Sequence, residues 1–244
     1  MKKLIAVAFL TICLLLASEQ ARAESPSITM YSLVYGKYLG GNGGIFYDKP
    51  VHQSGTTVCY RGFCGDIWGS YSLDGRNGFG KEVDFTGWYG NDWMEVGVGY
   101  FALWPSGFSD VVQPFLKLKH QFTAGKHEIT PYGKLELYWP ASGSIPQSGA
   151  IMAAGLLHIY HLLQFLDFNH EPALKYDNGA FGNDSAVFLQ YKADLSWKLN
   201  KNLTVQLPML KASTPITKVR DGRKTEFVAG TGAVFSFNWN DIVK

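Results

Sequence analysis

Charged side chains are scarce in this chain of 244 residues. Asp, Glu, Lys and Arg make up 17% of it, whereas about 25% is usual for a soluble domain. After residue 23 the chain also lacks an apolar run long enough for a transmembrane helix, which excludes helical spans from that part. Aromatic residues, at 15%, and glycines, 27 in number, are abundant. This composition fits either a membrane-spanning β-barrel or a secreted β-sandwich.

The N-terminal segment has the organisation of a secretory signal peptide. Lys2 and Lys3 precede the apolar run 4–17, and Ala21-Arg22-Ala23 is a small-x-small cleavage site. We expect residues 1–23 to be removed and residues 24–244 to form one exported domain. Without the signal, basic and acidic side chains balance, so no basic face predicts nucleic-acid binding.

Cysteines are few. Of the three, Cys13 lies in the predicted signal, which leaves Cys59 and Cys64. If Arg61-Gly62 is a two-residue hairpin turn, these cysteines form a directly opposed, non-hydrogen-bonded pair that a disulfide can bridge. An exported chain reaches an oxidising compartment, so we predict a Cys59–Cys64 disulfide. No metal or catalytic partner for these cysteines is evident.

The segment 111–139 contains two runs in which polar and apolar residues alternate. A strand sends successive side chains to opposite faces, so we predict an antiparallel hairpin with its turn at 123–126. The apolar face comprises Val112, Leu116, Leu118, Phe122, Ile129, Leu135, Leu137 and Trp139. In a transmembrane barrel this face would meet lipid, and the polar face would line an aqueous lumen.

Similar patterns recur along the whole domain and predict about twelve strands. The predicted ranges are 28–36, 51–60, 63–72, 81–90, 93–103, 111–122, 127–139, 150–161, 164–176, 185–198, 202–212 and 224–239. Long and short connections alternate strictly between them, with short turns at 61–62, 91–92, 123–126, 162–163 and 199–201. An up-and-down antiparallel barrel has this alternation, whereas a Greek-key sandwich gives no reason for it. We therefore predict an all-β transmembrane barrel.

The last strands carry apolar residues at every second position. The predicted outward ladders are Val187, Leu189, Tyr191, Leu195 and Trp197; Leu203, Val205, Leu207 and Met209; and Phe227, Ala229, Thr231, Ala233, Phe235, Phe237 and Trp239. Large aromatics on an outward face suit lipid better than water. In the sandwich alternative these faces would pack against each other in a core. Two strands fit less well, because 28–36 has tyrosines on the face of Leu33 and 150–161 is almost entirely apolar.

Short motifs in a fixed order resemble the TorF-type porin family. They are Val34–Lys37, Lys49–Val51, Gly65–Ser70, Lys81–Asp84, Gly87–Tyr89, Trp93–Tyr100, Asn202–Val205 and Ser213–Ile216. The resemblance covers most of the mature chain. It implies an outer-membrane barrel with a channel function, and it supplies no substrate or catalytic residue.

Once the apolar face is assigned to lipid, the opposite face gives the lumen. The candidate selectivity residues are Asp66, Glu82, Asp84, Glu95, Lys117, Lys119, Lys134 and Glu136. They form an acidic wall beside a basic wall, and the resulting transverse field can select solutes. Equally, these charges can pair across neighbouring strands and fill a narrow lumen. Asp167, Glu171, Lys175, Lys192 and Asp194 extend the polar lining on the far wall.

We therefore expect an outer-membrane protein that acts as a passive channel for small solutes. The alternatives are a non-conducting structural or adhesive barrel and a lipid-modifying enzyme. An enzyme would need a nucleophile beside a base, but no G-x-S-x-G motif accompanies the histidines, and His158 and His161 point to opposite faces of a strand. The expected partners are outer-membrane lipids and lipopolysaccharide, small solutes, periplasmic chaperones and the barrel-assembly machinery. No catalytic residue, metal or cofactor is predicted.

Overall fold

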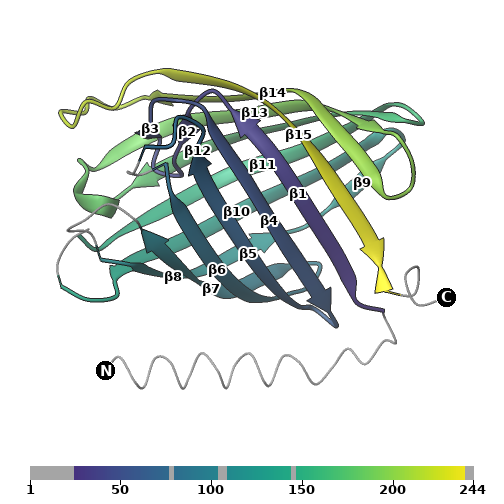
Figure 1. Ribbon diagram of the computed structural model, residues 1–244, viewed down its shortest axis with the longest axis horizontal. Coiled ribbons are helices and arrows are strands. Elements are labelled where there is room, and N and C mark those ends of the chain that lie inside the picture. Colours follow the sequence, from purple (N-terminus) through teal and green to yellow (C-terminus); the bar gives the residue numbers. More distant parts are fainter. Residues whose placement is uncertain (1–24, 77–79, 104–108, 144–146, 240–244) are drawn as a thin grey trace.

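The computed structural model describes residues 25–76, 80–103, 109–143 and 147–239, so the predicted signal peptide lies outside the described residues. Within these ranges, strands of 9 to 15 residues form one closed antiparallel barrel (Figure 1). The wall comprises β1 (Ser27–Tyr35), β4 (Val51–Tyr60), β5 (Phe63–Ser72), β6 (Glu82–Gly90), β7 (Met94–Leu103), β8 (Val111–Lys119), β10 (His127–Pro140), β11 (Gly149–Leu163), β12 (Leu166–Asp177), β13 (Ala186–Lys198), β14 (Leu203–Pro215) and β15 (Glu226–Asn238). No helix in this part of the chain has the length and hydropathy to cross a membrane.

Each wall strand pairs with the next along the chain, and β1 pairs with β15 over nine residues to close the barrel. The up-and-down topology confirms the predicted fold class. The short strand β9 (Phe122–Ala124) extends the β8 edge beside β10. A separate hairpin, β2 (Tyr38–Leu39) and β3 (Ile45–Tyr47), and one helical turn, η1 (Ala180–Gly182), belong to long connections.

The predicted turn between Cys59 and Cys64 is present. Arg61 and Gly62 have φ values of 51° and 81°, and two successive positive φ values define the mirror-image turn that suits a two-residue hairpin. Cys59 lies opposite Cys64 in the ladder, and a disulfide joins them. The prediction of this disulfide is confirmed.

The outer surface of the barrel is strongly apolar. Many large apolar side chains are exposed on it, among them Ile67, Phe85, Leu118, Leu135, Leu174, Leu189, Phe227 and Phe235. In water, continuous exposed apolar surface of this kind would promote association. Around a closed barrel it forms the lipid-facing band.

A β-bulge explains two predicted details that were wrong. In β14 an extra residue lies between Gln206 and Met209 opposite β15. Beyond it the alternation is inverted, so Met209 packs inward and Leu210 is exposed outside. In β11 a bulge between His161 and Leu163 carries the strand past the predicted turn, which lies at 164–165 instead.

The two predicted strands that fitted the alternating pattern less well, 28–36 and 150–161, are both strands in the structure. The segment 150–161 is a strand, β11, paired on both sides. In β1 the tyrosines face inward, since Tyr31 donates to Asp66 and Tyr35 is buried.

Phe85 and Thr86 are neighbours on β6 that point to opposite faces, and this gives a matched test of the lipid-facing assignment. Phe85 is 49% exposed outside, whereas Thr86 borders the luminal cavity. We expect Phe85→Lys to lower the free energy of unfolding by about 2–4 kcal/mol, because it places a charge in lipid. Thr86→Lys should cost less than about 1 kcal/mol, because its charge meets water and carboxylates. Urea unfolding in vesicles measures both, and equal losses would contradict the assignment.

Candidate functional site

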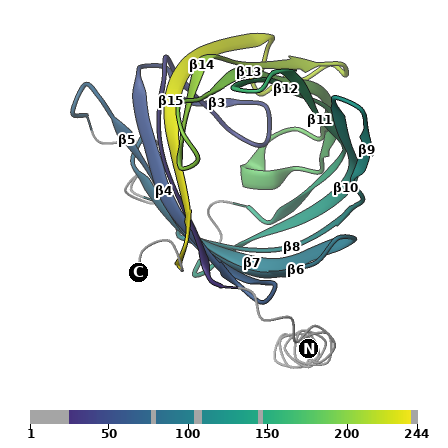
Figure 2. The ribbon, with the colours of Figure 1, turned by 90° about the vertical axis from the view of Figure 1, so that its right-hand side faces the viewer.

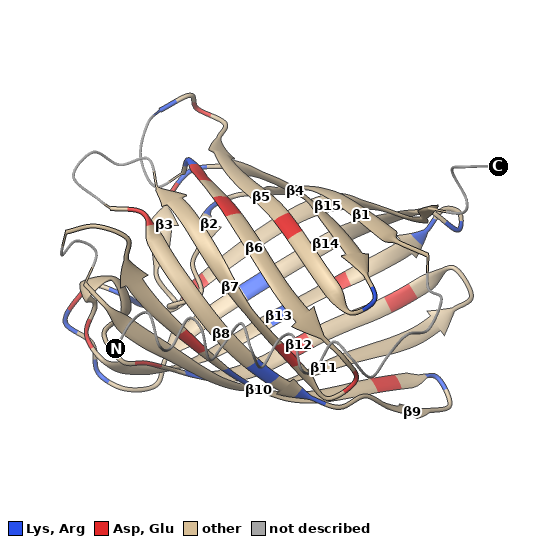
Figure 3. Ribbon diagram, turned by 90° about the horizontal axis from the view of Figure 1, so that it is seen from below, with Lys and Arg blue, Asp and Glu red and all other residues tan. Residues whose placement is uncertain are grey.

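The predicted selectivity residues come together inside the barrel. A luminal cavity of about 450 Å³ is bordered by Asp66, Glu82, Asp84, Glu95, Lys117, Lys134 and Glu136. Lys119 joins the group through an ion pair of 2.5 Å with Glu95. Figure 3 shows acidic and basic residues along the strands as well as in the connections. The structure thus brings these eight side chains together, while their role in selectivity stays a prediction.

The basic side of the cavity is largely neutralised by pairing. Glu95 contacts both Lys119 and Lys117, the latter at 3.8 Å. Lys134 pairs with Glu136 at 2.7 Å. These contacts match the alternative in which the luminal charges pair with their neighbours.

The acidic side has hydroxyl partners instead. Thr57 and Tyr31 donate hydrogen bonds to Asp66 at 2.5 and 3.3 Å, and Tyr38 donates to Glu82 at 2.6 Å. Among the described residues, no Lys or Arg lies within ion-pair distance of Asp66, Glu82 or Asp84. The carboxyl groups Glu82 and Asp66 of this wall therefore have hydroxyl partners in place of basic ones.

A segment that the sequence did not place in the lumen also shapes it. Residues 38–47, here called the strap, contain the β2–β3 hairpin and fold into the barrel near β15 and β13 (Figure 2). On one side Tyr38 of the strap contacts Glu82. On the other side the carbonyl oxygen of Gly41 accepts hydrogen bonds from Lys175 and Gln190, each at 3.3 Å. The strap therefore crosses the lumen from the acidic wall to the far wall.

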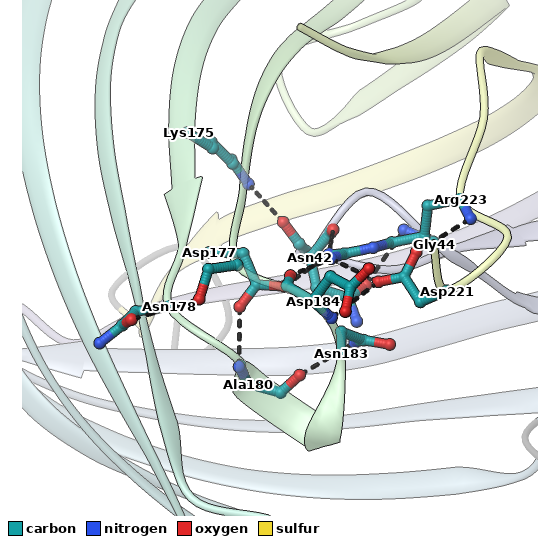
Figure 4. A network of polar contacts seen from close by, with 12 residues as sticks. Asn42, Gly44, Lys175, Asp177, Asn178, Ala180, Asn183, Asp184, Asp221 and Arg223 are labelled. Atoms are coloured by element: carbon teal, nitrogen blue, oxygen red, sulfur yellow. Dashed lines mark hydrogen bonds and ion pairs between the residues drawn. The ribbon is translucent and has the colours of Figure 1, made fainter. Parts of the chain in front are cut away.

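Arg223 fastens the strap (Figure 4). Its guanidinium donates to the carbonyl oxygen of Asn42 at 2.9 Å and pairs with Asp177 at 2.5 Å and Asp221 at 2.6 Å. The side chain is only 5% exposed and lies over the Phe188 ring, 4.6 Å from its centroid. A planar guanidinium can serve several acceptors at once, which an ammonium group cannot do with the same geometry.

Asp221, which lies in the connection 216–225, helps to hold the Arg223 side chain in place. Burial disfavours its charged form, but hydrogen bonds from Arg223 and from the backbone of Asp184 outweigh burial and lower the pKa of Asp221 below its ordinary value of 3.8. A lowered pKa means that the contact stabilises the fold at neutral pH. The contribution is lost only when the pH falls through that lowered pKa.

A second segment narrows the same end of the lumen. The backbone N–H of Ala180 donates to Asp177 at 2.7 Å, which holds the η1 turn. Phe181 of this turn packs against Phe46 of the strap and against Tyr138, with ring centroids 5.7 and 5.0 Å apart. The strap and η1 together form an inner constriction at the long-loop end.

The far wall contains one functional candidate that the sequence reasoning missed. Lys211 faces inward because of the bulge in β14, and its ammonium nitrogen lies 3.8 Å from the centroid of the Tyr35 ring. Pro208, in the middle of this strand, could have indicated the bulge from the sequence, since proline inside a strand marks an edge or a bulge.

The histidines divide between the two faces, as alternation predicts. His161 faces the lumen and contacts Asp167 at 2.8 Å and Glu128 at 3.0 Å. His158 lies outside between His127 and His170, at 2.9 and 2.8 Å. In the part of the chain described, no group of three or more His, Cys, Asp or Glu side chains is arranged to hold a metal ion.

One serine–histidine contact occurs on the outer face. Ser32 and His52 lie 2.9 Å apart on β1 and β4. A catalytic pair of this kind also needs a group that orients the imidazole. Among the described residues, no carboxylate contacts His52, so the geometry does not complete a catalytic triad.

Comparison with solved structures identifies the class of fold. The KdgM porin superposes with a TM-score of 0.52 and 12% identity, covering 87% of this chain and 99% of that one; another structure shows KdgM in complex with disordered oligogalacturonate. The NanC porin superposes with a TM-score of 0.51 and 12% identity, covering 85% of this chain and 98% of that one. The COG4313 outer membrane channel from Pseudomonas putida F1 superposes with a TM-score of 0.50 and 11% identity, covering 90% of this chain and 98% of that one.

At these identities the likeness shows the fold alone, which is that of outer-membrane porins and channels. Searches against family models and against curated proteins find no match.

Arg223→Gln should release the strap. Removing one partner of a buried ion pair costs about 3–5 kcal/mol because the remaining charges are left uncompensated. We expect trypsin to cleave after Lys37, which directly precedes the strap, at least about tenfold faster in the folded variant. Arg220→Gln, an exposed neighbour in the same connection, is the control and should digest like the original protein. Equal digestion of both variants would show that Arg223 does not hold the strap.

Proposed function

We propose that this protein is a passive outer-membrane channel for small solutes, a porin of the TorF type. The carrying observation is a closed barrel with an apolar exterior that encloses a charged cavity of about 450 Å³. A barrel that needed only to anchor loops would gain nothing from interior acidic groups that lack a basic partner, because burying them is costly. A lumen that admits polar solutes has a use for them.

The orientation follows from the connections. In bacterial barrels the long loops lie outside the cell and the short turns in the periplasm. The Cys59–Cys64 turn then lies in the oxidising periplasm, where a disulfide persists. Residues 1–23 would be the export signal of this domain, and lipids and lipopolysaccharide would cover the exterior. Periplasmic chaperones and the barrel-assembly machinery would deliver the chain to the membrane.

The constriction formed by the strap and η1 determines which solutes pass through the lumen. The strap and η1 narrow the outer end, so the effective pore is smaller than the bare barrel. Solutes then pass between the acidic group Asp66, Glu82 and Asp84 and the lysines of the far wall. This charge separation across the lumen orients dipolar solutes and slows ions of the wrong sign.

Two other functions have less support. A non-conducting barrel would require the strap to seal the lumen at all times. An enzyme is not favoured, because the outer Ser32–His52 contact lacks an orienting acid among the described residues.

Reversing one luminal charge should change ion selectivity. In planar bilayers we expect the refolded protein to form discrete conducting steps. Lys117→Glu should raise the cation-to-anion permeability ratio severalfold. Each unit of charge changes the energy of an ion about 10 Å away in water by about 0.4 kcal/mol before salt screening, the substitution changes the charge by two units, and cation and anion are affected in opposite directions. Lys224→Glu, on a 77% exposed loop side chain, is the control and should change the ratio less. Absence of conductance in the original protein would contradict the channel function.

Replacing the strap should enlarge the pore. A variant in which a short Gly-Ser linker replaces residues 38–47 removes every strap contact while it keeps β1 and β4. We expect its single-channel conductance to rise severalfold, because an aqueous path replaces protein atoms in the lumen. The same replacement at residues 141–147, in another long connection, is the control. An unchanged conductance would show that ions do not pass the strap.

A further inference from the structure

Two lysines lie directly opposite each other inside the barrel. Lys192 on β13 pairs in register with Lys211 on β14, and both border a cavity of about 210 Å³ together with Lys175. Like charges in directly opposed positions destabilise a sheet. A sequence that keeps such a pair in an enclosed lumen carries an energetic cost that the fold does not require.

Acidic groups compensate this charge only in part. Glu171 pairs with Lys192 at 2.9 Å, and it also accepts a hydrogen bond from Tyr132 at 2.5 Å. In the described chain, no carboxylate lies within ion-pair distance of Lys175 or Lys211. Lys211 instead lies over the ring of Tyr35, which is 2% exposed. Within ion-pair distance, the three lysines therefore have one carboxylate, that of Glu171, and it contacts Lys192.

The position of Lys211 depends on a specific backbone feature. Without the extra residue between Gln206 and Met209, position 211 would face lipid. The bulge thus turns a lysine into the lumen, beside two others. Bulges of this kind often re-aim a side chain at a functional site.

An oxygen atom already occupies the edge of this cluster. Lys175 and Gln190 both donate to the carbonyl oxygen of Gly41 in the strap, each at 3.3 Å. Two donors that converge on one oxygen have the arrangement by which proteins bind carboxylate or phosphate oxygens. The neighbouring cavity has room for further oxygens of the same group.

We propose that Lys175, Lys192, Lys211 and Gln190 form a luminal binding site for the oxyanion group of a small organic anion, a carboxylate or a phosphate. The site lies beside the strap on the wall opposite Asp66 and Glu82. Its role as a solute site rests on the proposed channel function. The binding itself can be measured whether or not the barrel conducts.

The test compares three solutes on the refolded protein: D-glucuronate, inorganic phosphate and neutral D-glucose. Calorimetric titration measures binding, and the reduction of KCl current in planar bilayers measures occupancy of the pore. We expect saturable binding of glucuronate or phosphate and none of glucose. A preference between the two anions identifies the acidic group that the site takes.

Variants assign the binding to the cluster. Lys211→Met keeps an unbranched side chain of similar length and should weaken anion binding about tenfold, the effect of losing a hydrogen bond to a charged group. Lys211→Arg retains the charge and should keep binding within a fewfold. Lys224→Met removes a charge from an exposed loop and should leave it unchanged.

The outcomes separate the two proposals. Conductance without saturable anion binding, or equal affinity in the original protein and Lys211→Met, would overturn the site and leave the channel intact. Anion binding that is lost in Lys211→Met, in a protein that does not conduct, would support the site and overturn the channel function.

Discussion

The whole structure depends on satisfying backbone hydrogen bonds where no water is available. Inside a bilayer an unpaired strand edge is too costly, so a sheet can cross only when it closes on itself. Here the closure lies between β1 and β15, which pair along the full length of β1. Because successive side chains of a strand point to opposite faces, closure puts one set in lipid and the other in the lumen. That division places apolar ladders outside and the Asp, Glu and Lys side chains of the wall inside. The character of the lumen is a consequence of this seam.

The interior is organised by charge as well as by shape. The strap reaches the acidic wall through the Tyr38 hydroxyl and the basic far wall through the Gly41 carbonyl. It therefore presents a donor to the carboxylates and an acceptor to the lysines. Arg223 adds a third attachment, which is buried and multiply bonded. One short segment thus bridges two walls whose charges differ in sign.

Local pattern was enough to predict the barrel, because strand alternation and turn chemistry are properties of neighbouring residues. The hairpin at Arg61-Gly62, the disulfide and most strand limits follow from it. The bulges at 207–208 and near Leu162 could not be located this way, since each depends on how two strands fit together, although Pro208 was a clue. The strap was missed for a similar reason. Its contacts with Glu82, Lys175 and Arg223 join residues far apart in the chain, and no periodicity in residues 38–47 predicts these contacts.

The sequence separation within the anchor has a consequence for biogenesis. Asn42 and Arg223 meet across 181 positions of chain, and Arg223 belongs to the connection just before the final strand. During assembly the early segment lacks its Arg223 attachment until almost the entire polypeptide has been added to the wall, and before then it can contact only Glu82, Lys175 and Gln190. A partly built barrel would therefore have a less firmly held interior, and the aperture would acquire its mature bore only as the sheet is sealed.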